Sequence, residues 1–321
     1  MSSVPSKIAF DQPPPILATS AVAAITPASI DVAKTSPLGK WFGWVTSIGL
    51  VAAIVFALRG ENFSSLAGMI PRSPLFWLIF AVSYLTVPVA DWLIFRRLWG
   101  LKRDSIAPLL RKTVLNALVV SYAGEAYFFA WARTRTDAAS RNSFGAVKDV
   151  AILSALVGNA ATLALVIAAW PMLSLIHLGG VRVPLLASVA LLTAISVSAF
   201  VFRAKVFHLT RRELMFVAVV HLGRTIATVG MIALLWHLAM PAVALQWWLL
   251  LSTGRMVVSR LPLIANKDLA FAGVAAFIFQ HNLVIVELMT LTAMLVFAAH
   301  LASAIGLLAH DIKLPGARPG A

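Results

Sequence analysis

The sequence contains no cysteine, which excludes disulfide bonds, thiolate catalysis and cysteine ligands to a metal. Charged residues are also scarce: they make up 12% of the chain, against 60% hydrophobic residues, and the mean hydropathy is +0.91. A soluble globular domain carries about 25% charged residues, so this composition excludes one. It is typical of a polytopic helical membrane protein, in which apolar runs of about 20 residues cross the bilayer.

Acidic residues are the rarer charge. The chain has 12 Asp and Glu against 26 Lys and Arg, which gives a formal net charge of +14. In a soluble protein such an excess suggests nucleic-acid binding, but no basic soluble domain is present to carry it. The basic residues cluster between apolar runs, as expected for loops that face the cytoplasm and anionic lipids. We therefore predict membrane lipids with anionic phospholipid headgroups as partners, and no nucleic acid.

Recognisable catalytic and nucleotide-binding motifs are missing as well. The seven histidines are scattered without an HExxH-type spacing. The sequence has no Walker loop, dinucleotide fingerprint or Ser/His/Asp arrangement. We expect a protein that is not an enzyme, uses no metal or cofactor, and does not carry out ATP-driven transport by itself.

The chain divides into a tail, a membrane domain and a second tail. Residues 1–36 are rich in Pro, Ser and Ala, and we predict a disordered cytoplasmic tail without a cleavable signal peptide. Residues 37–310 form the predicted transmembrane domain, and residues 311–321 a short cytoplasmic tail. The predicted apolar runs are 41–58, 75–95, 113–132, 150–176, 183–202, 214–238, 243–264, 269–279 and 283–308.

Basic flanks constrain the topology of the third run, 113–132. Lysines and arginines lie before it, over 96–112, and after it, over 133–148, and the positive-inside rule assigns both groups to the cytoplasm. A helix that crosses the membrane once cannot place both of its flanks on the cytoplasmic side. The run therefore either breaks the rule and spans, or enters the membrane and returns as a re-entrant hairpin. The Gly124-Glu125 pair inside the run favours the hairpin.

A second re-entrant element is predicted near the C-terminus. The run 243–264 would descend from the other face and break between Pro262 and Asp268, and the short run 269–279 would climb back. Six full spans then leave every basic cluster and both termini in the cytoplasm. We predict an all-α polytopic membrane protein of about six full spans and two re-entrant or broken helices, an arrangement typical of inverted-repeat transporters.

Glu125 is the first candidate site residue, because a carboxylate and the adjacent Gly124 at membrane depth are costly unless they line a polar cavity or pair with a cation. The functional interpretation is a substrate-binding carboxylate that contacts a headgroup or exchanges a proton. The alternative is a structural acid that Arg133 neutralises at the membrane edge. Both interpretations stay open from the sequence.

Arg255 and Arg260 are the second candidates. They lie in an apolar segment that contains Gly254 and ends at Pro262, so a continuous helix is not expected. Guanidinium groups suit a headgroup phosphate, whereas the alternative is that both side chains snorkel to the interface. A spacing of five residues places the two side chains about 140° apart around a helix. Snorkelling of both to the interface is then awkward, which favours a binding function for at least one of them.

His221 and Arg224 are three residues apart and share a helix face, so both are predicted to line the same cavity. For His221 alone, an interhelical hydrogen bond is the alternative. Asp91 is a weaker candidate, because it is able to pair with Arg96 or Arg97 at the interface. The remaining weaker candidates are Asn159 and Glu287.

Two of these segments resemble a known family. Gly124-Glu125 followed eight residues later by Arg133, and Arg260 followed by Leu-Pro262, are similar to motifs in the flippase-like membrane region of bacterial lysylphosphatidylglycerol synthases. The resemblance covers about residues 40–310. The family usually continues beyond that proline with a glycine-rich turn and a glutamate, whereas this chain has Ala-Asn-Lys-Asp over 265–268 and then Gly273, with no glutamate before Glu287.

The resemblance implies a stand-alone lipid translocase of the bacterial inner membrane. We expect no lysyl transfer, because no aminoacyl-transferase domain follows the last run. Headgroups would pass between the two re-entrant elements by alternating exposure. Two other interpretations stay open: an integral-membrane transferase acting on a lipid-linked substrate, and a non-catalytic scaffold whose partners are envelope-synthesis proteins.

Overall fold

The computed structural model describes residues 70–119, 123–135, 143–173, 207–260, 267–278 and 283–313, together with the isolated positions 68 and 194. All of them belong to one unit of the chain, Gly43–Ala321. The predicted tail 1–36 and the predicted runs 41–58 and 183–202 lie outside the described residues, as do residues 314–321.

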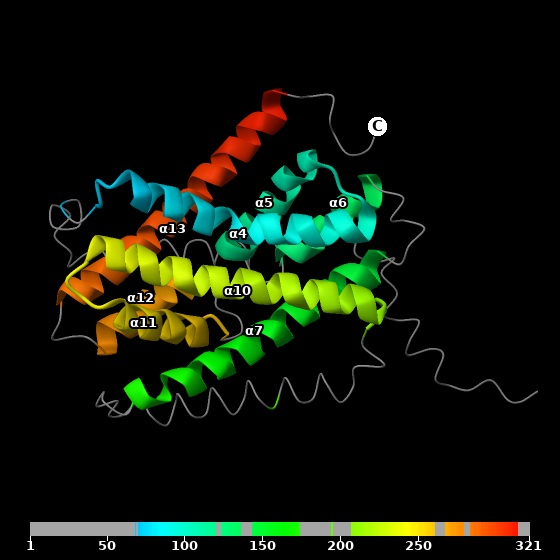
Figure 1. The fold of residues 1–321 in the computed structure, drawn as a ribbon. Coiled ribbons are helices and arrows are strands. Elements are labelled where there is room, and N and C mark those ends of the chain that lie inside the picture. The colour runs from blue at the N-terminus through cyan, green and yellow to red at the C-terminus, as the bar shows by residue number, and fades with distance from the viewer. Residues whose placement is uncertain are drawn as a thin grey trace, which may run out of the picture. The chain divides into compact units, whose positions relative to one another are not determined.

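Helices account for all the regular structure in this part of the chain, and no strand occurs in the ranges just given. The predicted all-α class is therefore confirmed for them. Four helices are long (Figure 1): α4 (Pro74–Trp99), α7 (Ser143–Leu173), α10 (Arg211–Ala239) and α13 (Leu283–Lys313). Four are short: α5 (Ile106–Leu118), α6 (Ala123–Arg135), α11 (Leu245–Val258) and α12 (Lys267–Ile278).

Each long helix contains a segment that is long and apolar enough to cross a membrane. These segments are Pro74–Trp99, Gly145–Pro171, Arg211–Ala239 and Val284–Leu307. A hydrocarbon core about 30 Å thick needs about 20 helical residues, whereas the short helices have only 12 to 14 residues. The described part of the chain therefore contains four candidate membrane spans and four helices that are too short to span.

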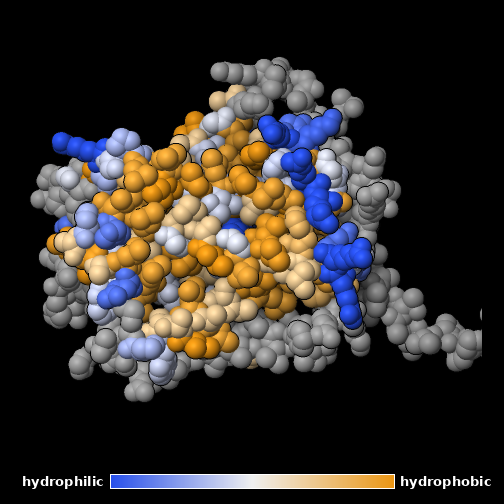
Figure 2. Space-filling model, in the orientation of Figure 1, coloured by the Kyte–Doolittle hydropathy of each residue, from blue (hydrophilic) through white to orange (hydrophobic). Residues whose placement is uncertain are grey.

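Exposed apolar side chains run along one face of α4 and one face of α10. Residues three or four positions apart share a helix face, and a long apolar face of this kind is costly in water but is the expected surface against lipid tails. Figure 2 shows the corresponding apolar surface, with a small hydrophilic spot near its centre. The exposed side chains are Leu75, Leu78, Val82, Leu85, Val89 and Leu93 on α4, and Met215, Val219, Leu222 and Ile226 on α10.

α4 and α10 pack in antiparallel fashion. Near the end of α4, the Arg97 guanidinium lies 4.8 Å from the ring centroid of Phe216, near the start of α10. At the other end, Phe76 and Trp236 belong to the same apolar cluster. The last turn of α4 and the first turn of α10 therefore share one end of the bundle.

That end is basic. Asp149, near the start of α7, accepts hydrogen bonds from the backbone N–H groups of His208 and Leu209, just before α10, so α7 begins at the same end. Figure 2 shows hydrophilic residues gathered along this edge of the apolar surface. Several clusters that the positive-inside rule assigns to the cytoplasm meet here: Arg96, Arg97, Lys102, Arg103, Lys148, Arg211 and Arg212.

α5 and α6 form an antiparallel hairpin. The side-chain oxygen of Asn116 accepts a hydrogen bond from the N–H of Gly124 at 2.7 Å, and one turn earlier Lys112 lies 6.0 Å from the ring centroid of Phe128. Gly124 is required for this close approach, because a Cβ there would overlap the backbone carbonyl of Lys112. The third predicted run is thus two helices separated by a break, and neither is long enough to span.

α11 and α12 form a second antiparallel pair. Arg255 on α11 donates to the Asp268 carboxylate on α12 at 2.6 Å from Nε, and its Nη2 pairs with the same oxygen. α12 begins at Lys267. Residues 261–266, which contain the predicted break at Pro262, lie outside the described residues.

Each hairpin is anchored by its own apolar cluster. Lipid tails are as apolar as these side chains, so close packing rather than transfer from water holds the hairpins in place. The first cluster joins α5 and α6 to α4 and α10 through Phe95, Leu109, Phe128 and Val217. The second joins α11 and α12 to α10 and α13 through Trp236, Trp248, Phe271 and Leu288.

Candidate functional site

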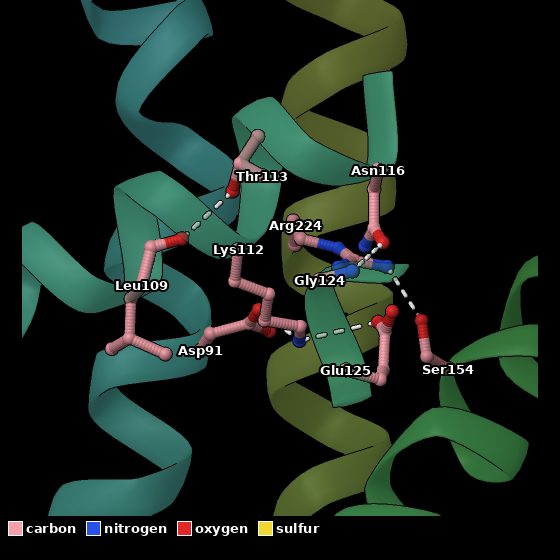
Figure 3. A network of polar contacts seen from close by, with 9 residues as sticks. All are labelled: Asp91, Leu109, Lys112, Thr113, Asn116, Gly124, Glu125, Ser154 and Arg224. Atoms are coloured by element: carbon pink, nitrogen blue, oxygen red, sulfur yellow. Dashed lines mark hydrogen bonds and ion pairs between the residues drawn. The ribbon is translucent and has the colours of Figure 1, made fainter. Parts of the chain in front are cut away.

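Lys112 on α5 lies between two carboxylates inside the bundle, as Figure 3 shows. Its Nζ is 2.7 Å from Asp91 Oδ2 on α4 and 3.4 Å from Glu125 Oε1 on α6. The side chains of Lys112 and Asp91 are 9% and 3% exposed, and that of Glu125 is 20% exposed. A buried charge without a counter-ion costs several kcal/mol, so the three groups stabilise one another.

The hairpin places Glu125 in this network. Gly124 lets the first turn of α6 approach the backbone of α5, and Asn116 accepts the hydrogen bond from its N–H group. The next residue, Glu125, then lies beside Lys112 (Figure 3). The Gly-Glu pair singled out in the sequence therefore works as a unit, in which the glycine permits the approach and the glutamate supplies the charge.

Arg224 on α10 contributes a second cation. Its Nη2 donates to Ser154 Oγ on α7 at 2.9 Å, and its guanidinium interacts electrostatically with Asp91. At 1.5 Å per residue, Arg224 is about 20 Å from either end of Arg211–Ala239. The charge therefore lies near the middle of an apolar helix.

The guanidinium of Arg260 lies against Gly158 on α7. A Cβ at Gly158 would overlap Nη1, Nη2 and Cζ of Arg260, and Nη2 also contacts the Met256 sulfur at 3.6 Å. Gly158 follows Ser154 by four residues, so both lie on one face of α7. The guanidinium groups of Arg224 and Arg260 thus meet successive turns of the same helix face.

Lys267, at the start of α12, belongs to the same region. It interacts electrostatically with Arg260, Asp268 and Glu125, so the start of α12 and the start of α6 lie near each other. The polar network defined by these contacts contains five cations and three carboxylates, and its formal charge is positive. Its members are Lys112, Arg224, Arg255, Arg260, Lys267, Asp91, Glu125 and Asp268.

His221 is buried beside this network. The residue is 1% exposed, and neither ring nitrogen has a hydrogen-bond partner among the described residues, although the backbone of Val150 lies nearby. The ring is close enough to Asp91, Lys112 and Arg224 to interact with them electrostatically. The structure therefore brings His221 and Arg224 to one region.

Arg133 lies apart from the network. It is exposed near the end of α6, and its guanidinium is 5.8 Å from the ring centroid of Phe129. The sequence left open whether Arg133 neutralises Glu125, and the cation beside Glu125 is Lys112 instead. The alternative in which Arg133 neutralises Glu125 is therefore wrong, while the prediction that Arg133 binds the substrate stays a prediction.

Lys112 is the site residue that the sequence interpretation missed. It was counted with Arg111 among the basic residues that flank the third run, but Lys112 is buried and Arg111 is half-buried. For Asp91 the sequence offered Arg96 or Arg97 as an alternative partner. Both of these lie over aromatic rings, and Asp91 pairs with Lys112. An acid inside an apolar helix requires a cation at its own depth, and this requirement was the available signal.

The other predicted residues take varied positions. Asn159 is buried on α7 directly after Gly158, and Glu287 is half-buried near the start of α13. Pro262 lies outside the described residues. Groups of three or more His, Asp or Glu side chains that could hold a metal ion do not occur in the described part of the chain.

Comparison with known proteins leaves the function to be inferred from the site. The chain matches no protein-family model, and no curated protein or solved structure is significantly similar to it. The resemblance to lysylphosphatidylglycerol synthases therefore stays a hypothesis from two short motifs.

Proposed function

We propose that this protein is a lipid translocase-like protein of the bacterial inner membrane, which moves or handles an anionic phospholipid headgroup through the polar network. One observation carries the proposal: Arg224 and Arg260, from different parts of the chain, meet successive turns of one face of α7. Guanidinium groups bind phosphate oxygens through paired hydrogen bonds. Two of them at neighbouring positions form a receptor for one phosphate group.

The energetics of burial support this proposal. Charged side chains inside membrane-spanning helices are costly and usually mark the path of a substrate or ion. Here the cations of the network outnumber its carboxylates. The excess positive charge favours an anionic ligand over a neutral or cationic one.

We further propose six full spans, of which four are the long helices and two are the runs 41–58 and 183–202. The hairpin α5–α6 follows the basic end of α4, whereas α11 follows the other end of α10. The two hairpins therefore open toward opposite ends of the bundle, which supports re-entry from opposite faces. The basic end then faces the cytoplasm, and both termini lie on that side.

In this mechanism the headgroup passes the network while its acyl tails stay in lipid. The cations neutralise the phosphate during passage, and the apolar faces of α4 and α10 contact the surrounding lipid. The two hairpins are short elements packed on long helices. Movement of one hairpin at a time would expose the site to one face and then to the other.

The substitution Gly158→Ala tests the phosphate site. The new Cβ would occupy the position of the Arg260 guanidinium and displace it. Loss of charge-assisted hydrogen bonds worth about 1.5–3 kcal/mol corresponds to about tenfold to hundredfold weaker binding. We expect this loss for a radiolabelled short-chain phosphatidylglycerol, measured by equilibrium binding to the purified full-length protein in a neutral detergent.

The matched control is Gly230→Ala on α10, because a Cβ at Gly230 meets no atom within 4 Å. This variant is expected to bind phosphatidylglycerol like the wild type. The proposal fails if the wild type does not bind this lipid, or if Gly158→Ala binds it with unchanged affinity.

A further inference from the structure

One oxygen of Glu125 is left unsatisfied by the network. Oε1 lies 3.4 Å from Lys112 Nζ, beyond the usual hydrogen-bond length, whereas Oε2 is buried and has no hydrogen-bond partner among the described residues. Asp91, in contrast, accepts the Lys112 hydrogen bond at 2.7 Å. A buried carboxylate oxygen without a donor is destabilised. Of the two carboxylates beside Lys112, Glu125 is therefore the less firmly held.

Glu125 competes with an anionic ligand for the same cations. Its charge interacts with Lys112 on α5 and with Lys267 on α12. These two cations in turn interact electrostatically with Arg224 and Arg260, the two arginines proposed to bind the phosphate. The charged and titratable groups around Glu125 come from several packed elements, to which α7 adds the neutral Ser154. These groups are Lys112 on α5, Asp91 on α4, Arg224 and His221 on α10, Arg260 after α11, and Lys267 and Asp268 on α12.

We propose that Glu125 takes up a proton when the network binds an anionic headgroup, so that the two binding events are coupled. This inference rests on the proposed function. The Glu125 carboxylate accepts a proton from water and becomes neutral, and Lys112 stays protonated, so that the attraction of Lys112 and Lys267 acts on the phosphate instead of on Glu125. When the headgroup leaves, the proton returns to water and the ion pair forms again.

The coupling is reciprocal: a bound proton strengthens headgroup binding by the same factor by which a bound headgroup strengthens proton binding. If the site opens alternately to the two faces, a proton enters on one side and leaves on the other. A proton gradient across the membrane then drives movement of the headgroup in one direction.

The test is the pH dependence of binding of the short-chain phosphatidylglycerol to the purified full-length protein, from about pH 5 to about pH 9. If a proton binds together with the headgroup, the dissociation constant of the wild type is expected to rise with pH, by at most about tenfold per pH unit. Glu125→Gln mimics the protonated acid, and we expect it to keep the low-pH affinity across the range. The matched control is Glu213→Gln in the capping box of α10, which keeps the slope because glutamine also serves in that motif.

The coupling is overturned by a wild-type affinity that does not change with pH, or by a slope that persists in Glu125→Gln, which would point to another group such as His221. Absence of phosphatidylglycerol binding at every pH would instead contradict the proposed function. If Glu125→Gln does not fold, measurements on the wild type alone decide whether proton binding and headgroup binding are coupled. Addition of the lipid in weakly buffered solution should take up as much as about one proton per bound lipid, and no uptake at any pH would refute the inference.

Discussion

The ammonium of Lys112 and the carboxylate of Asp91 form an ion pair of 2.7 Å inside the helix bundle, with 9% and 3% of their side chains exposed. The pair joins the α5–α6 hairpin to α4, the first of the long helices. Removal of one partner from a buried pair is far more destabilising than replacement of both, because it leaves one charge buried without compensation. The two residues are therefore expected to tolerate substitution together better than separately.

Lys112→Met should lower the free energy of unfolding by about 3–5 kcal/mol, since Asp91 is left without its hydrogen-bonded cation. The double variant Lys112→Met/Asp91→Asn should recover only part of that loss, because Glu125 still lacks its cation. Unfolding of the purified protein in detergent, followed by circular dichroism, measures both. Losses that simply add in the double variant would show that the two side chains do not interact.

Gly124→Ala should destabilise the hairpin strongly, because the added Cβ overlaps the backbone carbonyl of Lys112 and backbone atoms cannot move aside cheaply. Gly223→Ala on α10 is the matched control: it adds a Cβ with no atom within 4 Å and should stabilise the helix by about 0.5–1 kcal/mol. Melting temperatures of the two variants give the comparison. A Gly124→Ala protein as stable as the control would refute the close packing of α5 on α6.

The helix break in the third run was predictable from the sequence. Gly124 and Glu125 interrupt an otherwise apolar segment, and both are unfavourable inside a spanning helix. In the structure α5 ends at Leu118 and α6 begins at Ala123, so Gly124 and Glu125 lie in the first turn of the second helix. The basic residues that flank the run pointed to the same break.

The partners of the charged residues were not predictable in the same way. Asp91 and Lys112 are separated by 21 residues, and the sequence does not reveal that α5 packs on α4 at that depth. The approach of Arg260 to Gly158 depends on the register between α7 and the segment after α11. A glycine occurs inside a helix for many different reasons, so the sequence alone does not show that an arginine packs against Gly158.

The predicted re-entry of the third run is testable because the chain has no native cysteine. Single cysteines at the exposed positions Lys102 and Arg133, before α5 and near the end of α6, should both be protected from an impermeant maleimide added on the periplasmic side of cells. The control position is Ala242, exposed in the turn after α10, which should be labelled. Labelling at Arg133 together with protection at Lys102 would show that the run crosses the membrane.

Headgroup movement itself is the most direct test. We would reconstitute the full-length protein in vesicles with fluorescent phosphatidylglycerol and follow the fraction that external dithionite bleaches over time. In vesicles with the wild type or Gly230→Ala, the lipid should move faster than in protein-free vesicles. Gly158→Ala should move the lipid more slowly than the wild type does. Glu125→Gln should be inactive because it cannot release a proton. Lipid movement by the wild type no faster than in protein-free vesicles, or normal movement by Glu125→Gln, would contradict the role of the polar network.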